Sequence, residues 1–307
     1  MRNVAIIDIG TNTFHLMVVD LDNDRAVLHK EKVAVRLGKG GISENKISDE
    51  AIERAIRTLK DFRTTAEKHA VEEIFATATS AARNAKNGED FVKKAKEETG
   101  ISINIIPGDK EAEYIYQGVK QALEVGKETS LVMDIGGGSV EFIICDQDQI
   151  FWLHSFEIGA QRLLDKFQKH DPISTEDIEA LKTYLNEELK PLKEQLKHYQ
   201  PTHLIGSSGT FDTLVDIAYA EANQEKPDDI SFTLSIDDFH RIYQEFVEKN
   251  RAERLAIPGM LEMRVDMIVV ASCLIEYILE INPFSYIHVS TYSLKEGILE
   301  EITQKLQ

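Results

Sequence analysis

The stretch that decides the fold is LVMDIGGGSVEFIICD, residues 131–146. An apolar run ends at Asp134, three glycines follow, and a second run of alternating apolar side chains holds Glu141. A turn that only reverses the chain needs one glycine or an Asn-Gly pair. Three glycines in a row allow another group to approach the backbone closely. We therefore expect a β-hairpin whose turn receives a ligand.

The same pattern occurs near the N-terminus, in AIIDIGTNTFHLMVVDLD at residues 5–22. Asp8 corresponds to Asp134 with a shift of 134 − 8 = 126, and the same shift carries His15 to Glu141. In both copies an apolar strand ends at Asp-Ile-Gly, a turn of small residues follows, and a strand returns. The period is too long for a solenoid. It indicates two related domains that each open with the same hairpin.

Helical and strand patterns alternate through both halves of the chain. A helix is predicted from the N-cap Ser48, and a capping box at Ser174 and Asp177 starts another. A segment that is apolar nearly all round predicts a buried helix at 265–281. Alternating strands and helices indicate an α/β fold, and the hairpins make its sheets mixed rather than purely parallel. Further strands are predicted at 72–80 and 101–108, and residues 203–210 are predicted as a strand that runs into a glycine-rich turn. Further helices are predicted at 89–98, at 110–124 and from residue 211.

Length and charge exclude several classes of protein. The chain of 307 residues is about twice as long as the ~150 residues that are typical of one domain, so two domains are expected. The formal net charge of −18 argues against a general nucleic-acid binder, which needs a broad basic surface. No apolar stretch approaches the ~20 residues of a membrane span, and the N-terminus lacks the pattern of a signal peptide. Cys145 and Cys273 show no metal-binding spacing. We expect a cytoplasmic protein.

Two familiar glycine motifs do not fit. A dinucleotide-binding fingerprint requires its glycines to open a helix, whereas the residues after Gly138 alternate as in a strand. The stretch LGKGGIS at 37–43 lacks the Gly-Lys-Ser/Thr order of a Walker loop, and we interpret it as a flexible turn.

The paired hairpins favour a phosphate ligand. The alternative for each copy is a tight turn whose aspartate accepts local hydrogen bonds. Equivalent turns, one in each domain, are expected to face each other across an interdomain cleft. Consecutive backbone N–H groups in such turns bind anions, and Mg²⁺ is usually held by one or two carboxylates with phosphate oxygens and water. We therefore expect a chain of phosphates between the domains, with Mg²⁺ held by Asp8 or Asp134.

Several stretches together resemble one known family. They are DIGTNTFHLMV, ATATSAARNAKNG, IPGDKEAEYIYQGV, MDIGGGSVEF, EIGAQRLLDKF, IGSSGTFDTL, RAERLAIPGMLEMRVDMIVV and VSTYSLKEGIL. In this order they resemble the exopolyphosphatase/guanosine pentaphosphate phosphohydrolase family, in its short two-domain form. The resemblance implies two ribonuclease H-like domains of the actin-like ATPase fold, with mixed sheets and an interdomain cleft. The implied domains are 1–122 plus 292–307, and 123–291.

The resemblance also implies roles for individual residues. Glu111 matches the catalytic glutamate, which would orient or deprotonate the attacking water; the alternative is a first-turn carboxylate that stabilises its helix. Asp134, with Asp8, is the implied metal ligand, and Glu141 a second carboxylate for metal or water. Arg83 would bind the phosphate chain, although solvent exposure is the usual fate of an arginine. The other implied phosphate-binding residues are Thr11, Asn12, Thr13, Gly136, Gly137, Gly138, Ser139, Gly206, Gly209 and Thr210.

Some positions depart from the commoner family pattern. The stretch GSSGT at 206–210 has serines where alanine or threonine is common. His15 and Lys295 stand where arginine is frequent, and lysine lacks the bidentate fork of a guanidinium. We expect these differences to affect chain-length preference more than the reaction.

The expected function is exopolyphosphatase activity: release of the terminal phosphate of inorganic polyphosphate, with Mg²⁺ or Mn²⁺ as cofactor. The nearest alternative is hydrolysis of guanosine pentaphosphate to the tetraphosphate. A non-catalytic phosphate or nucleotide sensor and a kinase or ATPase are further alternatives. The overall acidity predicts a dependence on K⁺ as well, and the family suggests a homodimer. No nucleic-acid or membrane partner is expected.

Overall fold

The computed structural model describes residues 2–306. The chain divides into two compact units: unit 1 comprises Met1–Tyr114 and Leu294–Gln307, and unit 2 comprises Ile115–Ser293. The first boundary lies eight residues before the one expected after residue 122, and the second lies two residues after the one expected after residue 291. The first falls inside helix α4 (Gly108–Ala122), and the second falls just before helix α12 (Leu294–Leu306).

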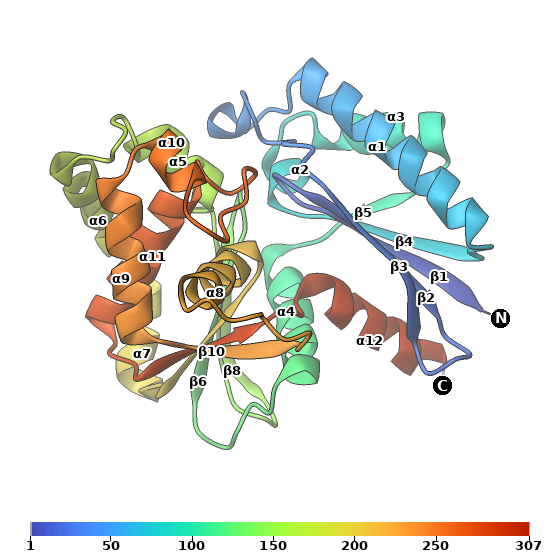
Figure 1. The fold of residues 1–307 in the computed structure, drawn as a ribbon. Coiled ribbons are helices and arrows are strands. Elements are labelled where there is room, and N and C mark those ends of the chain that lie inside the picture. The colour runs from blue at the N-terminus through green and yellow to red at the C-terminus, as the bar shows by residue number, and fades with distance from the viewer. Residues whose placement is uncertain (1, 307) are drawn as a thin grey trace. The chain divides into compact units, whose positions relative to one another are not determined.

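Unit 1 is built on a five-stranded mixed sheet with the order β3-β2-β1-β4-β5 (Figure 1). Strands β1, β2 and β3 pair antiparallel, and β4 and β5 continue the sheet parallel to β1. This is the strand order of a ribonuclease H-like domain, as predicted. The strands span Asn3–Ile9 (β1), Phe14–Asp20 (β2), Ala26–Val33 (β3), Glu73–Ala78 (β4) and Ile103–Ile105 (β5).

Helices cover the sheet of unit 1. Helices α1 (Asp49–Lys68) and α3 (Gly88–Thr99) supply the core of one face, and α12 lies against β1 (Figure 1). The predicted cap of α1 is present, since the Ser48 side chain accepts a hydrogen bond from the backbone N–H of Ala51. A short helix, α2 (Ser80–Asn84), follows β4 directly.

Unit 2 repeats this plan with a six-stranded sheet, in the order β10-β11-β9-β6-β7-β8. Strands β6, β7 and β8 pair antiparallel, β9 lies parallel to β6, and β11 lies parallel to β9. Both units therefore open with the same three antiparallel strands, which confirms the predicted duplication. The strands span Ser130–Ile135 (β6), Val140–Cys145 (β7), Ile150–Phe156 (β8), His203–Ser207 (β9), Ser231–Ser235 (β10) and Tyr286–Ser290 (β11).

The core of unit 2 centres on α11 (Ile268–Ile281), which is buried on nearly all sides as predicted, although it begins three residues later than the apolar run. It packs against α5, α6, α8 and α9. The Ser174 hydroxyl caps α6 through the N–H of Asp177, but the capping box is incomplete because the Asp177 carboxylate turns to the N–H groups of Lys169 and His170. The helices are α5 (Ala160–Phe167), α6 (Thr175–Glu188), α7 (Lys190–Tyr199), α8 (Gly209–Glu221), α9 (Ile236–Glu248) and α10 (Arg251–Leu255).

Within residues 2–306, no helix is both long and apolar enough to cross a membrane.

Candidate active site

The two Asp-Ile-Gly turns have the same hydrogen-bonded geometry. The N–H of Gly10 donates to the carbonyl of Thr13 at 3.1 Å, and the N–H of Gly136 donates to the carbonyl of Ser139 at 3.1 Å. A Cβ on Gly10 or Gly136 would lie only 2.9 or 3.0 Å from that same carbonyl oxygen, so both positions disfavour a larger residue. The shift of 126 residues seen in the sequence is thus a repeat of backbone structure.

In the triple-glycine turn of unit 2, the backbone carbonyl groups point towards α5 and the N–H groups point away from it. The carbonyls of residues 136–138 accept hydrogen bonds of 2.9–3.1 Å from the N–H groups of residues 159–161, where α5 begins. In a planar trans peptide the N–H points opposite to the C=O. The N–H groups of residues 137–139 therefore point away from α5, as in the concave backbone sites that bind anions.

The corresponding turn of unit 1 is held from the side by the stretch predicted as a flexible turn. The carbonyls of Thr11 and Asn12 accept hydrogen bonds from the N–H groups of Gly38 (2.9 Å) and Arg36 (2.8 Å). Gly38 packs so closely on Thr11 that a Cβ would lie 2.5 Å from its methyl group. This stretch is thus part of the support of the turn, and by the same peptide geometry the N–H groups of residues 12 and 13 point away from it.

The carboxylates of unit 2 lie in one row across the sheet. Asp134 on β6 is in register with Glu141 on β7 and with Ser207 on β9, so the three side chains share a face. Both carboxylates are buried and both accept hydroxyl hydrogen bonds. Glu141 Oε1 accepts from Ser155 Oγ at 2.6 Å, and Asp134 Oδ2 accepts from Ser207 Oγ, also at 2.6 Å.

This row fits a magnesium ion that is completed by substrate, not by a protein cage. Among residues 2–306, no three His, Cys, Asp or Glu side chains converge as a metal-binding group. Mg²⁺ is often held by one or two carboxylates while phosphate oxygens and water fill its other positions. Asp134 and Glu141 can supply those carboxylates. In unit 1, Asp8 occupies the equivalent register position, opposite His15 and Thr77.

Glu111 and Arg83 form an ion pair within unit 1. Glu111 lies in the first turn of α4, and its Oε2 accepts a hydrogen bond of 2.8 Å from Arg83 Nη1, which also donates to the carbonyl of Ile106 at 3.2 Å. Both side chains are largely buried, with 9% and 16% of their surface exposed. Arg83 is therefore not the solvated surface residue of the alternative interpretation.

The end of β9 and the start of α8 contain one residue with a strained backbone and two closely packed glycines. Gly206 lies within β9, where the ring of Phe211 fills the space of its absent side chain. Ser208 has φ 73° and ψ 174°, a conformation that is rare for residues other than glycine. Its hydroxyl donates to the carbonyl of Ile135 at 2.8 Å, which ties the start of α8 to the triple-glycine turn. The predicted Gly209 and Thr210 form the first turn of α8 and are buried.

Arg264 is a candidate site residue that the sequence prediction did not include. Its guanidinium lies against Gly209, so that a Cβ there would overlap it, and its Nε is buried with no hydrogen-bond partner. Burial lowers the pKa of Arg264, while the charges of Asp212 and Asp134 oppose that shift. A cation beside a helix N-terminus suits an anionic ligand. The signal in the sequence is its place in the stretch RAERLAIPGMLEMRVDMIVV, from which no role for an individual residue was predicted.

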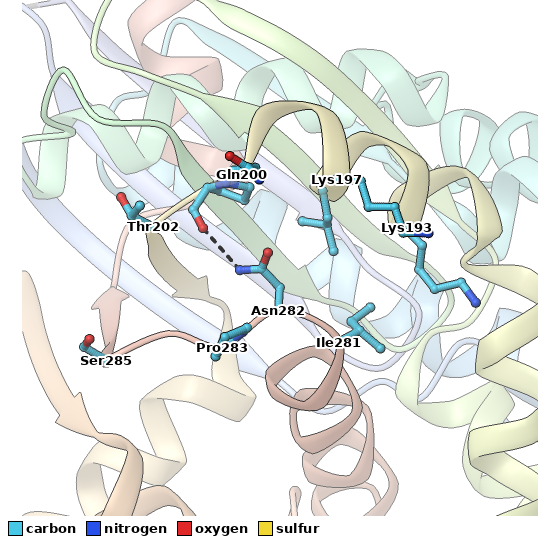
Figure 2. A pocket seen from close by; sticks show the side chains of 10 residues that line it. Lys193, Lys197, Gln200, Thr202, Ile281, Asn282, Pro283 and Ser285 are labelled. Atoms are coloured by element: carbon cyan, nitrogen blue, oxygen red, sulfur yellow. Dashed lines mark hydrogen bonds between the residues drawn. The ribbon is translucent and has the colours of Figure 1, made fainter.

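Two large hollows of unit 2 lie away from these residues. One, of about 660 Å³, is bounded by α7 and the segment after α11, with Lys193 and Lys197 on one side (Figure 2). Asn282, which lines this hollow, donates a hydrogen bond to the carbonyl of Pro201 at 3.1 Å (Figure 2). The other, of about 690 Å³, contains His203 and His288. None of the predicted site residues lines either hollow.

The duplicated fold, the paired turns and the buried carboxylates are those expected of an enzyme that acts on phosphate groups. The chain belongs to the Ppx/GppA phosphatase family, whose family model matches residues 17–306. This confirms the resemblance seen in the sequence.

Solved structures agree with this assignment. An exopolyphosphatase from Cytophaga hutchinsonii is 46% identical with a TM-score of 0.96, covering 100% of this chain and 99% of that one. A Ppx/GppA family member from Aquifex aeolicus is 26% identical with a TM-score of 0.81, covering 100% and 99%. An exopolyphosphatase-like protein that is 23% identical, with a TM-score of 0.86 and coverage of 99% and 100%, shares the fold. The chain is a phosphoanhydride hydrolase.

Proposed function

We propose that this protein is an exopolyphosphatase, which releases the terminal phosphate of inorganic polyphosphate. The observation that carries the proposal is the pair of equivalent turns, one in each unit, whose N–H groups point away from their supporting segments. Such turns suit a linear chain of phosphates, because each can take the oxygens of a different phosphate. The 46% identity to a protein described as an exopolyphosphatase supports the same substrate.

In the proposed reaction, Glu111, Arg83 and the two turns each have a separate role. A water molecule attacks the terminal phosphorus, the bridging P–O bond breaks, and inorganic phosphate and a chain shortened by one unit are formed. Glu111 orients this water and accepts its proton, while Arg83 holds the Glu111 carboxylate and contacts the phosphate chain. The turns at residues 11–13 and 136–139 bind the non-bridging oxygens.

Asp134 and Glu141 would hold Mg²⁺, with Asp8 as a further carboxylate of unit 1. When bound, the cation would neutralise negative charge on the phosphates, which is the main requirement of phosphoryl transfer. We propose that Glu111 and Asp134 are both required for this reaction. Loss of either Glu111 or Asp134 should then abolish turnover.

The test measures phosphate release from long polyphosphate, short polyphosphate and guanosine pentaphosphate, with Glu111→Gln and the matched exposed variant Glu113→Gln on the same helix. We expect the fastest release from polyphosphate. Glu111→Gln should lower kcat by about 10²–10⁴-fold and still bind polyphosphate, whereas Glu113→Gln should keep the activity of the unmodified protein.

Other outcomes separate the alternatives. Preferential cleavage of the pentaphosphate would replace polyphosphate by that nucleotide as the substrate. Binding of polyphosphate without turnover by the unmodified protein would favour a sensor. ATP consumption without polyphosphate cleavage would favour a kinase or ATPase.

A further inference from the structure

One oxygen of Asp134 accepts two serine hydroxyls. Ser207 Oγ donates to Asp134 Oδ2 at 2.6 Å, and Ser293 Oγ donates to the same oxygen at 2.5 Å. Ser207 is the last residue of β9, and Ser293 lies in the connection from β11 to α12. Three segments of unit 2 that are distant in sequence therefore meet at one carboxylate oxygen.

These contacts limit how the carboxylate can bind a cation. Hydrogen bonds from a hydroxyl to a carboxylate are short and strong, and both distances fall in the range of about 2.5–2.7 Å typical of them. A carboxylate oxygen offers about two lone-pair positions. With both positions of Oδ2 used by Ser207 and Ser293, a cation at Asp134 would be bound through Oδ1 alone.

We propose that Ser207 and Ser293 are positioning residues for the divalent cation, since they make Asp134 a one-oxygen ligand of fixed orientation. This proposal rests on the assignment of the cation to Asp134 in the proposed function. A cation held by so few protein oxygens needs phosphate oxygens to complete its coordination. The cation and the phosphate chain should therefore strengthen each other's binding by the same factor.

The experiment measures Mn²⁺ affinity by electron paramagnetic resonance of the free ion, with and without methylenediphosphonate, a phosphate-chain analogue that is not hydrolysed. The variants are Ser207→Ala, Ser293→Ala, the double variant and Ser293→Thr, which keeps the hydroxyl. The matched control is Ser272→Ala, because the Ser272 hydroxyl is also buried but has no hydrogen-bond partner. Thermal unfolding of each variant identifies any loss of folding.

We expect Mn²⁺ to bind the unmodified protein more tightly when the analogue is present. Each alanine variant should lose about 10–100-fold in Mn²⁺ affinity in the presence of the analogue, as is usual when a partner of a metal ligand is removed. Ser293→Thr should recover most of the loss, and Ser272→Ala should show none.

Unchanged or tighter Mn²⁺ binding by the folded double variant would overturn the positioning role. Asp134→Asn distinguishes this failure from failure of the metal assignment. If Asp134→Asn loses Mn²⁺ while the serine variants keep it, only the positioning role is wrong. If Asp134→Asn keeps Mn²⁺, the assignment of the cation is wrong, and the positioning role falls with it.

Discussion

Arg83 Nη1 lies 2.8 Å from Glu111 Oε2, so the candidate phosphate-binding arginine and the candidate catalytic glutamate form a single ion pair. The two residues come from different elements, the short helix α2 and the first turn of α4. A partner that is itself largely buried fixes the direction of the carboxylate. The two roles assigned separately from the sequence are thus physically coupled.

We expect this coupling to appear in a double-mutant cycle. Arg83→Ala and Glu111→Gln should each lower the free energy of unfolding, and the double variant should lose less than their sum, by about 1–3 kcal/mol. Chemical denaturation of the four proteins measures this. The exposed pair Arg63–Glu67 on α1 is the control, with an expected coupling of about 0.3–0.5 kcal/mol. Equal coupling in the two cycles would contradict the importance of the buried pair.

The start of α5 should be intolerant of added volume. A Cβ on Gly159 would overlap the backbone of Gly137 and Gly138, so Gly159→Ala should destabilise the protein by about 1–3 kcal/mol and raise KM for polyphosphate. The control is Gly126→Ala, where the nearest atom is 4.0 Å away. Thermal unfolding and steady-state kinetics on both variants check this. A normal KM for Gly159→Ala would show that the turn does not contact substrate.

The protein should be more stable with glycine than with alanine at position 208. Both variants lose the hydroxyl bond to Ile135, but only glycine relieves the strain of φ 73°, which is of order 1–3 kcal/mol. We expect the unfolding free energy of Ser208→Gly to exceed that of Ser208→Ala by about 1 kcal/mol, measured in denaturant. At Ser272, within α11, the order should reverse because glycine disfavours helix.

Acid should weaken the attachment of α12. Burial alone would raise the pKa of the Glu301 carboxyl, but hydrogen bonds from Lys110, Lys305 and Tyr114 outweigh burial and lower that pKa from 4.5 to about 2. A carboxyl whose pKa is lower in the folded state stabilises the fold above its unfolded pKa. This contribution is therefore lost as the pH falls from about 4.5 towards 2.

Glu301→Gln should remove this pH dependence. Because the carboxylate is about one third exposed, the expected loss at pH 7 is only about 1–2 kcal/mol of unfolding free energy. Denaturation at pH 7 and at pH 3 measures both effects, with the exposed Glu97→Gln as control. An equal loss at the two pH values would show that the carboxylate charge is not responsible.

Removal of cations tests the proposed cofactors. Chelation of divalent ions should abolish phosphate release, and Mg²⁺ should restore it. Replacing K⁺ by another monovalent cation at fixed ionic strength keeps general screening between the acidic protein and the polyanion constant. We expect this replacement to slow release from long polyphosphate, which would show that K⁺ itself takes part. An unchanged rate without K⁺ would remove potassium from the proposal.

The duplicated fold could be predicted because its signal is local. The Asp-Ile-Gly turns recur at one fixed spacing, and each follows an apolar run, Val4–Ile7 or Leu131–Met133. Strands β3 and β8 gave weaker signals, since the residues of β3 are mostly exposed or half-buried and include the charged run His29–Glu31. Edge strands such as these lack the continuous apolar pattern of a buried strand.

The partners of the site residues could not be predicted from spacing. Ser207 and Ser293 lie 73 and 159 residues from Asp134, and only the folded sheet brings the three together. The contact of Arg264 with Gly209 likewise depends on how α8 and α11 pack. At Asp177 the local motif was recognised but gave only half of the predicted capping box. The Ser174 hydroxyl accepts from the N–H of Asp177, whereas the Asp177 carboxylate accepts from the N–H of Lys169.

The carbonyl groups of the triple-glycine turn accept hydrogen bonds from the beginning of α5, so the shape of the proposed anion-binding turn depends on the position of that helix. Leu163 and Phe167 anchor α5 in the hydrophobic core of unit 2. In the proposed site, shortening either side chain would weaken substrate affinity although neither side chain contacts substrate, and a packing defect in the hydrophobic interior would be measured as a binding defect.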